Sequence, residues 1–160
     1  LNLQSVFYNA MMKMVCLRRQ FMQISHITFI VHDIERTTVM LQQLFDAKVI
    51  YDSGENTFSL SQERFFDIDG LWLVIMQGES LKETTYNHIA FKIDEKEYDE
   101  YKKRIETLGL TFREGRSRIE GEGRSLYFYD YDNHLFELHT GTLAARLKSY
   151  DCYNKQHGRV

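Results

Sequence analysis

The sequence is poor in cysteine, in net charge and in long hydrophobic runs. Its 160 residues include two cysteines, Cys16 and Cys152, which fits a reducing compartment better than a disulfide-stabilised secreted fold. The formal net charge is −3 and the pI is about 6.1, so the chain has no overall field to hold a nucleic acid or an anionic membrane. We therefore expect a cytoplasmic protein whose partners are small molecules.

The first 22 residues differ from the rest of the chain. They contain no apolar run close to the roughly 20 residues of a membrane-spanning helix, and no apolar segment followed by a small-residue cleavage site. We expect residues 1–22 to be an extension outside the working fold. One domain is expected over residues 23–150, ending in a helix, with a tail over residues 151–160.

From residue 23 the apolar pattern predicts a strand, a helix and further strands, and then repeats that order. Alternation in "HITFIV" at 26–31 and in "HIAFKI" at 88–93 is typical of half-buried strands. Asp33 is expected to cap the first helix, and Asp94 to open the second with a capping box. Further strands are predicted at 48–51, 57–61, 64–68, 71–76, 110–112, 125–130 and 134–140.

The two halves keep a common register. His26 and His88 are 88 − 26 = 62 residues apart, and "DGLWLV" at 69–74 lies 63 residues before "DNHLFE" at 132–137. We infer an α+β fold of two βαβββ modules, at about 23–78 and 86–142, whose curved mixed sheets surround a concavity. A pseudo-twofold axis would bring His26 and His88 to equivalent points facing that cavity.

Strand parity predicts which side chain joins the two histidines. In "HLFELH" at 134–139, Glu137 points to the same side as Leu135 and His139. A carboxylate there is costly to bury unless it is paired or metal-bound. Its counterpart in the first half is Val74, so the duplication supplies two histidines and one carboxylate. This set suits a catalytic divalent cation such as Mn²⁺, Fe²⁺ or Zn²⁺, with open positions for water or substrate.

The histidines also have a simpler interpretation. A single histidine on a strand is more often a hydrogen-bonded core residue than a ligand, and only the matched positions favour His26 and His88 as ligands. His134 beside a turn and His139 beside Glu137 are better candidates for supporting roles.

The paired modules resemble the vicinal-oxygen-chelate (glyoxalase/bleomycin-resistance/dioxygenase) superfamily. The resemblance lies in "SHITFIV", "YNHIAFKI" and "YFYDYDNHLFELHTGTLAARL", and it spans about residues 22–150. Within the fosfomycin-resistance branch, "TFSLSQERFF", "GLWLVIMQGESL" and "EGEGRSLYFYD" resemble the FosX-type epoxide hydrolases rather than the thiol transferases. The resemblance implies a homodimer in which modules from two chains complete each site.

The resemblance also implies the chemistry and the residues that perform it. Mn²⁺, or another divalent metal, would be held by His26, His88 and Glu137, and the epoxide of fosfomycin would be hydrated to a vicinal diol. Glu63 in "SQERFF" matches the general base, although by itself a Glu in that context is most often a solvated turn residue. The implied substrate contacts are Thr28 near the oxirane and, at the phosphonate, Arg118, Ser125, Tyr127 and Arg146.

Arg113, Arg116, Arg118 and Arg124 are interspersed with glutamates, a pattern that is usually a solvated face.

Several other functions remain open from the sequence. A metal-free protein of the same fold could sequester a drug, and Fe²⁺ in the same ligand set serves ring-cleaving dioxygenases. The nearest rival is a thiol transferase that acts on fosfomycin. Bound metal would argue against the metal-free protein, and oxygen consumption with a catechol would identify the dioxygenase. Diol production without thiol would exclude the transferase as the main activity.

Overall fold

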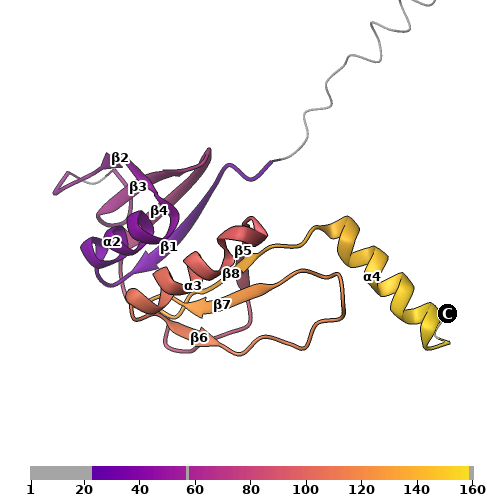
Figure 1. Cartoon of the computed structure of the whole chain (residues 1–160). Helices are drawn as coiled ribbons and strands as arrows, with labels where there is room; N and C mark the ends of the chain where they lie inside the picture. Colours follow the sequence, from indigo (N-terminus) through magenta and orange to yellow (C-terminus); the bar gives the residue numbers. More distant parts are fainter. Residues whose placement is uncertain (1–22, 57, 159–160) are drawn as a thin grey trace, which may run out of the picture.

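The computed structural model describes residues 23–56 and 58–158, which form two four-stranded sheets with helices (Figure 1). The predicted extension over residues 1–22 lies outside the described residues. The first module contains β1 (His26–Val31), α2 (Ile34–Phe45), β2 (Lys48–Asp52), β3 (Glu63–Ile68) and β4 (Leu71–Gln77). The second contains β5 (His88–Lys92), the 3₁₀ turn η1 (Glu95–Glu97), α3 (Tyr98–Thr107), β6 (Thr111–Arg113), β7 (Ser125–Tyr129) and β8 (Leu135–His139). Helix α4 (Leu143–Gln156) follows the second module.

The two modules have the same topology, which confirms the predicted duplication. Their strand orders are β1-β4-β3-β2 and β5-β8-β7-β6. In each sheet the first strand pairs in parallel with the last strand of its module, and the other pairings are antiparallel. Val74 is paired with Thr28, and Glu137 is paired with Ala90. The register therefore puts Val74 and Glu137 at equivalent positions, as the sequence predicted.

The predicted caps explain where the module helices begin. The side chain of Asp33 accepts a hydrogen bond from the backbone N–H of Arg36 at 2.9 Å, which satisfies a donor that the first turn of α2 would otherwise leave free. Asp94 and Glu97 form the predicted capping box at η1, ahead of α3. Both helices therefore begin where short polar side chains replace missing backbone partners.

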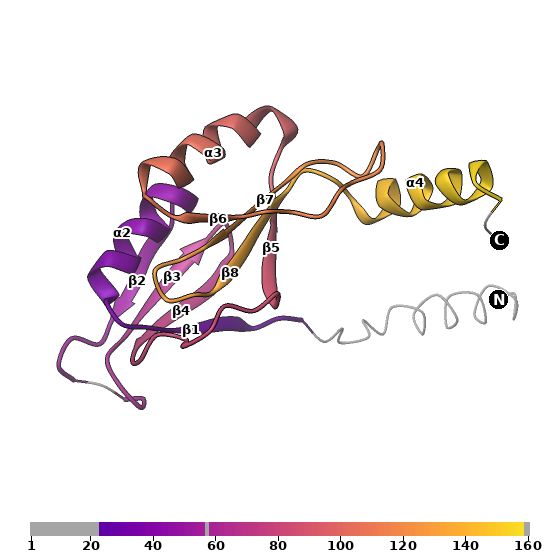
Figure 2. The same ribbon diagram turned by 90° about the horizontal axis from the view of Figure 1, so that it is seen from below.

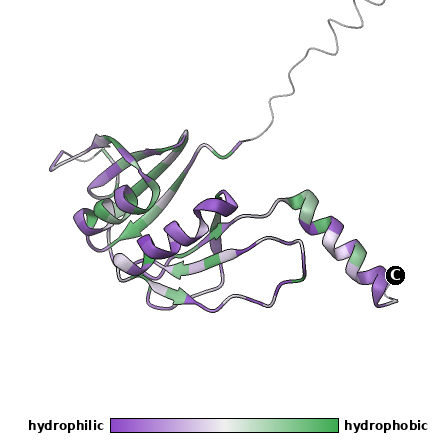
Figure 3. Cartoon of the chain, viewed as in Figure 1, coloured by the Kyte–Doolittle hydropathy of each residue, from purple (hydrophilic) through white to green (hydrophobic). Residues whose placement is uncertain are grey.

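The modules share one hydrophobic core, formed by the sides of the sheets that face the helices. The ring of Phe29 on β1 lies 5.2 Å from that of Phe136 on β8, measured between centroids. The ring of Phe45, at the end of α2, lies 4.9 Å from that of Phe91 on β5. Figure 3 shows mainly hydrophobic residues along the strands and mainly hydrophilic residues on α3. Because successive side chains of a strand point to opposite faces of the sheet, every second side chain faces the shared core and the side chains between them point away from it.

Most predicted strands match the structure to within one residue at each end, but two predictions differ by more than that. The strand predicted at 57–61 is wrong, because the described residues 58–61 form bends and Phe58 and Leu60 are 91% and 95% exposed. Apolar alternation there has no neighbouring strand to pair with and no core to face. At the other end, α4 continues to Gln156, so residues 151–156 belong to the helix instead of a separate tail. No glycine or proline interrupts the helix before Gly158, whose φ is 62°.

Arg104 on α3 joins the two module helices. Its Nη1 donates hydrogen bonds to the carbonyl oxygens of Gln43 and Leu44, at 3.4 and 3.3 Å, and to Oδ2 of Asp46 at 3.0 Å. Its Nη2 donates to Oε1 of Glu100 at 2.7 Å. Because the last carbonyl groups of a helix lack partners within the helix, this one guanidinium completes the end of α2 from the neighbouring module. Figure 2 shows α2 and α3 along the same side of the molecule.

We expect Arg104→Met to lower the free energy of unfolding by about 1–2 kcal/mol, because the change removes charge-assisted hydrogen bonds but keeps an unbranched apolar stem in place of that of arginine. Lys102→Met is the matched control, since the 3.9 Å pair of Lys102 with Glu106 is exposed and such pairs contribute about 0–1 kcal/mol. Urea unfolding of both variants measures the difference. Equal losses in the two variants would contradict the assigned role of Arg104.

Candidate active site

The second sheet brings His88 and Glu137 together on the side that faces away from the shared core. Because β5 and β8 are parallel and Ala90 is paired with Glu137, the side chains of His88 and Glu137 project from one face. His88 Nε2 lies 3.0 Å from Glu137 Oε2. Glu137 is 5% exposed, which confirms the predicted burial of this carboxylate.

The geometry of His88 fixes the position of one ring proton. Its Nδ1 lies 2.8 Å from the carbonyl oxygen of Tyr86, and a carbonyl oxygen only accepts, so Nδ1 carries a hydrogen. In the neutral ring Nε2 then presents a lone pair to Oε2 of Glu137. Nε2 of His88 and Oε2 of Glu137 would then repel each other at 3.0 Å. A cation between them, either a proton or a metal ion, removes this repulsion. A backbone acceptor behind the imidazole is also the usual support of a metal-binding histidine, so this pair fits a divalent metal.

The second oxygen of Glu137 receives hydrogen bonds from the other side. Its Oε1 accepts from Ser125 Oγ at 2.5 Å and from Arg118 Nη2 at 2.9 Å. Burial alone would raise the pKa of Glu137, but hydrogen bonds from Ser125 and Tyr127 and the charge of Arg118 hold that pKa below its ordinary value. Glu137 is therefore an ionised carboxylate at neutral pH, as a metal ligand must be.

Arg118 has donors available for an anion. Its Nη2 donates to Ser125 Oγ at 2.5 Å and to the hydroxyl of Tyr127 at 3.1 Å. Its Nη1 is buried and has no hydrogen-bond partner in the described part of the chain. Leaving a buried charged donor unpaired is costly, and a phosphate-like group has the oxygens to pair with it. Burial, together with Glu137, raises the pKa of Tyr127, so its hydroxyl remains a donor.

His139 and Arg146 extend this group toward α4. Arg146 Nη2 lies 3.2 Å from His139 Nε2, and His139 Nδ1 lies 2.8 Å from Ser125 Oγ. Burial and the positive charges of Arg118 and Arg146 lower the pKa of His139, so its ring is neutral at pH 7. The resemblance predicted Arg118, Ser125, Tyr127 and Arg146 as one binding group, and the structure gathers them around Glu137.

The first sheet holds the other predicted residues, again on the side away from the core. The ring of His26 lies against that of Trp72, with centroids 4.5 Å apart. Thr28 is paired with Val74, and Glu63 with Met76, so parity puts the side chains of His26, Thr28 and Glu63 on one face. Glu63 is 9% exposed at the start of β3, so its interpretation as a solvated turn residue is wrong.

One chain therefore carries two separate half-sites. We call the group on the first sheet the base half-site, which contains His26, Thr28 and Glu63. We call the group on the second sheet the ligand half-site, which contains His88, Glu137, Arg118, Ser125, Tyr127 and Arg146. The inward-facing contact of Phe29 with Phe136 leaves the two half-sites on opposite sides of the shared core. Among residues 23–56 and 58–158, no group of three or more His, Cys, Asp or Glu side chains could hold a metal ion.

Tyr86 is a site residue that the sequence did not predict. Besides its carbonyl contact with His88, its ring lies 5.1 Å from that of His88 and 6.1 Å from that of Tyr127. The guanidinium of Arg113 lies 4.5 Å from the centre of the Tyr86 ring, and a hollow of about 630 Å³ opens beside both residues. The sequence signal for Tyr86 was its position two residues before His88. Its contact with His88 is made by a backbone carbonyl, which every residue has, so no pattern of side chains reveals it.

The comparisons with known proteins agree with this fold. Residues 23–138 match the family model described as the Glyoxalase/Bleomycin resistance protein/Dioxygenase superfamily, and the chain belongs to that superfamily. Within it, the fosfomycin resistance protein FosX of Listeria innocua is 63% identical over 127 residues, which are 79% of this chain and 96% of the relative.

Two solved structures are also similar to this chain. One is a single-residue variant of FosX from Listeria monocytogenes, complexed with Mn(II) and 1S,2S-dihydroxypropylphosphonic acid. It matches with a TM-score of 0.75 and 55% identity over 82% of this chain and 99% of its own. FosX from Mesorhizobium loti matches with a TM-score of 0.72 and 53% identity over 81% and 99% of the two chains. The predicted resemblance is confirmed.

Among the described residues, none of the helices is long and apolar enough to cross a membrane.

The loop that carries Arg118 is organised around a buried glutamate. Glu122 is 0% exposed, and its carboxylate accepts from Arg116 Nη1 at 3.0 Å and from the backbone N–H of Ile119 at 2.8 Å. Arg116 Nη2 also donates to the hydroxyl of Tyr150 on α4 at 3.0 Å. The hydrogen bond from Arg116 lowers the pKa of Glu122 to about 2. Arg116 therefore pairs with a buried glutamate, while its own side chain stays 42% exposed, as its sequence context suggested.

We expect Glu122→Gln to lower the free energy of unfolding at pH 7 by about 1.5–3 kcal/mol, because a charge-assisted hydrogen bond is lost. The folded-state pKa is depressed, so this stabilisation is present above the unfolded-state pKa and disappears as the pH falls from about 4.5 to about 2. Thermal unfolding at pH 7 and pH 3 checks this, with the exposed Glu120→Gln as control. A difference between wild type and Glu122→Gln that stays constant over this range would rule out the ion pair.

Proposed function

We propose that this chain is a metal-dependent hydrolase that adds water to the epoxide of fosfomycin, giving a vicinal-diol phosphonate and hence antibiotic resistance. The observation that carries the proposal is the approach of His88 Nε2 to Glu137 Oε2 at 3.0 Å, with a buried arginine donor beside it. The similarity to FosX proteins, one solved with Mn(II) and a dihydroxypropylphosphonic acid, supports the choice of substrate and product. The location we propose is the cytoplasm, where the exposed, unpaired Cys152 stays reduced.

The active form is a homodimer in which the base half-site of one copy faces the ligand half-site of another. Each chain has both halves, so a twofold arrangement produces two identical sites. Apolar side chains beside His26 support this assembly, since Ile30 is 40% and Trp72 is 37% exposed on the same face of the first sheet. Exposed apolar groups around a polar centre are typical of an interface.

Mn²⁺, or another divalent cation, is held by His26 of one copy and by His88 and Glu137 of the other. Two imidazoles and one carboxylate form a ligand set that these cations accept. When bound, the cation supplies Lewis acidity toward the epoxide oxygen and a template for the phosphonate. Tyr86 keeps the Nε2 lone pair of His88 directed at the site, and Arg118 and Ser125 keep Glu137 ionised and oriented.

The phosphonate binds on the ligand half-site. Arg118 offers the unpartnered Nη1 donor, and the hydroxyl of Tyr127 remains protonated because burial raises its pKa. Arg146 adds a second guanidinium from α4, and Ser125 lies between the two arginines. Charge-assisted hydrogen bonds from fixed arginines orient a phosphonate better than flexible surface lysines do.

Glu63 acts as the general base, and Thr28 lies near the oxirane. Glu63 takes a proton from water while the water oxygen bonds to an epoxide carbon and the carbon–oxygen bond of the ring breaks. The released oxygen takes up a proton from solvent and Glu63 gives up its proton to solvent, so one water molecule is added in total and the product is a diol. The backbone N–H of Glu63 donates to Ser53 Oγ at 3.0 Å, and its carbonyl oxygen accepts from the backbone N–H of Ser53 at 3.1 Å, which holds Glu63 at the start of β3. A positioned base typically contributes about 10²–10⁴ in rate.

We expect the purified protein with Mn²⁺ to convert fosfomycin into the diol without any thiol. Glu63→Gln should reduce this rate by about 10²–10⁴ because the base is lost, while Mn²⁺ affinity changes little because Glu63 is not a ligand. Phosphorus NMR, with and without glutathione or bacillithiol, measures the products.

Glu55→Gln, an exposed carboxylate on the loop before β3, is the control and should keep full activity. A product that forms only with thiol would identify a transferase. Undiminished diol formation by Glu63→Gln would remove Glu63 from the mechanism.

A further inference from the structure

A chain of hydrogen bonds connects α4 to Glu137, and the donor of each bond can be assigned. Arg146 Nη2 lies 3.2 Å from His139 Nε2, and a guanidinium only donates, so Nε2 accepts and the ring hydrogen of His139 is on Nδ1. Nδ1 lies 2.8 Å from Ser125 Oγ and 3.1 Å from the carbonyl oxygen of Arg124. Ser125 Oγ in turn lies 2.5 Å from Glu137 Oε1.

The hydroxyl of Ser125 has one possible orientation in this chain. Arg118 Nη2 donates to its oxygen at 2.5 Å, and His139 Nδ1–H points at the same oxygen. With both lone pairs engaged, the hydroxyl hydrogen is directed to Glu137, which only accepts. His139 therefore acts through Ser125 on Oε1 of Glu137, whereas His88 faces Oε2.

The backbone is shaped to admit the ring of His139. A Cβ atom on Gly141 would lie 2.6 Å from His139 Nε2 and 2.9 Å from Cε1, closer than real contacts allow. Gly123, with φ of 84°, lets its loop pass close to the backbone of Gly141, since a Cβ there would lie 2.5 Å from the backbone nitrogen of Gly141. Gly141 thus borders the ring of His139, and Gly123 allows the neighbouring loop to pack against Gly141.

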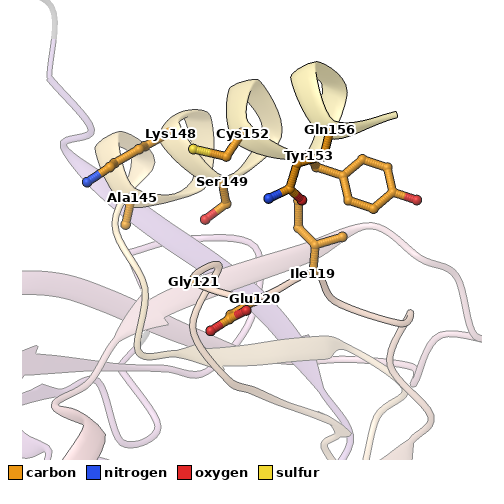
Figure 4. Close-up of a pocket in the computed structure, with 9 residues that line it drawn as sticks. All are labelled: Ile119, Glu120, Gly121, Ala145, Lys148, Ser149, Cys152, Tyr153 and Gln156. Carbon is orange, nitrogen blue, oxygen red and sulfur yellow. The ribbon is translucent and has the colours of Figure 1, made fainter. Parts of the chain in front are cut away.

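Polar contacts connect α4 with the rest of the second module. None of its described residues is buried. A hollow of about 430 Å³ opens between α4 and the loop at Ile119 and Gly121 (Figure 4), with Ala145, Ser149 and Cys152 along its edge. Tyr150 accepts a hydrogen bond from Arg116 on that loop, and Arg146 meets His139 on β8. The contact with His139 therefore joins α4 to the strand that carries Glu137.

We propose that His139 is a positioning residue with two separable tasks: its Nε2 holds Arg146 for the anion, and its Nδ1–H orients Ser125 and, through it, Glu137 for the metal. The inference rests on the proposed function for the identity of the anion and the metal. Neither task requires turnover, because each concerns the binding of one component.

Two substitutions separate the tasks. The amide of asparagine reaches the position of Nδ1 but not that of Nε2, so His139→Asn keeps the donor to Ser125 and loses the acceptor for Arg146. Glutamine reaches the position of Nε2, so His139→Gln keeps the acceptor and loses the donor. The matched controls are His134→Asn and His134→Gln, since the His134 side chain is 11% exposed against 14% for His139 and pairs with Asp130 at 2.7 Å.

The measurements are Mn²⁺ affinity by electron paramagnetic resonance and the affinity of the Mn²⁺-loaded protein for inorganic phosphate by calorimetry. For His139→Asn we expect phosphate affinity to fall about tenfold and Mn²⁺ affinity to change less than about twofold. For His139→Gln we expect the reverse, because loss of a group that orients a ligand costs about 10–100-fold in metal affinity. KM for fosfomycin should rise in the first variant, and kcat at low Mn²⁺ should fall in the second.

Equal losses in the two variants, unchanged affinities, or the same changes in the His134 controls would overturn the proposal. Ser125→Ala provides a second route if a His139 variant does not fold. It should weaken Mn²⁺ binding about as much as His139→Gln, and the double variant should lose no more than either single one. If the wild type binds Mn²⁺ and phosphate but forms no diol, the proposed function fails, while the contrast between the asparagine and glutamine variants still decides the role of His139.

Discussion

The site depends on one close approach, in which Nε2 of His88 is held 3.0 Å from the Oε2 carboxylate oxygen of Glu137, so that a cation, either a proton or a metal ion, must lie between them. The carbonyl of Tyr86 prevents the ring from turning away, and Arg118 and Ser125 hold the other oxygen of Glu137. A buried carboxylate is tolerated only when its charge is compensated. The surrounding hydrogen bonds therefore keep both groups oriented for a cation in a site that excludes most water.

The packing of the modules decides where the remaining ligand must come from. Because Phe29 meets Phe136 in the core, the polar faces of the two sheets point outward from one chain. The duplication has also diverged, since Val74 stands where Glu137 stands in the second module. One face keeps His26 and Glu63, and the other keeps His88, Glu137 and the arginines. In the proposed homodimer these two unlike faces meet across a twofold axis, so we expect activity to require assembly.

The sequence predicted the local structure well because local structure follows periodicity and capping. The caps at Asp33 and Asp94, the two-module repeat and the equivalence of Val74 with Glu137 were all confirmed. The failed strand at 57–61 shows the limit of that approach. Alternation of apolar and polar residues indicates that a segment can be half-buried. A strand also needs a neighbouring strand to pair with, and Phe58 and Leu60 have no core to face.

The site was less accessible from sequence for physical reasons. Parity assigns side chains to one face of a sheet but does not say which faces of two sheets meet, so the separation of His26 from His88 within one chain was not predictable. Glu63 is buried where β3 pairs with β4, opposite Met76, which its immediate neighbours in sequence do not reveal. The buried donor of Arg118 and the carbonyl of Tyr86 depend on distant backbone geometry. Resemblance to a family pointed to Glu63 and Arg118, but neither pattern nor resemblance pointed to Tyr86.

Subunit complementation tests most directly whether the metal lies between two copies. His26→Ala and His88→Ala each remove one ligand and should be inactive alone. In a mixed dimer of the two variants, one site lacks both histidines and the other is intact. An equimolar mixture that exchanges subunits freely should therefore recover roughly a quarter of the wild-type rate of diol formation. No recovery after verified subunit exchange, or full activity in either variant alone, would contradict a metal site shared by two chains.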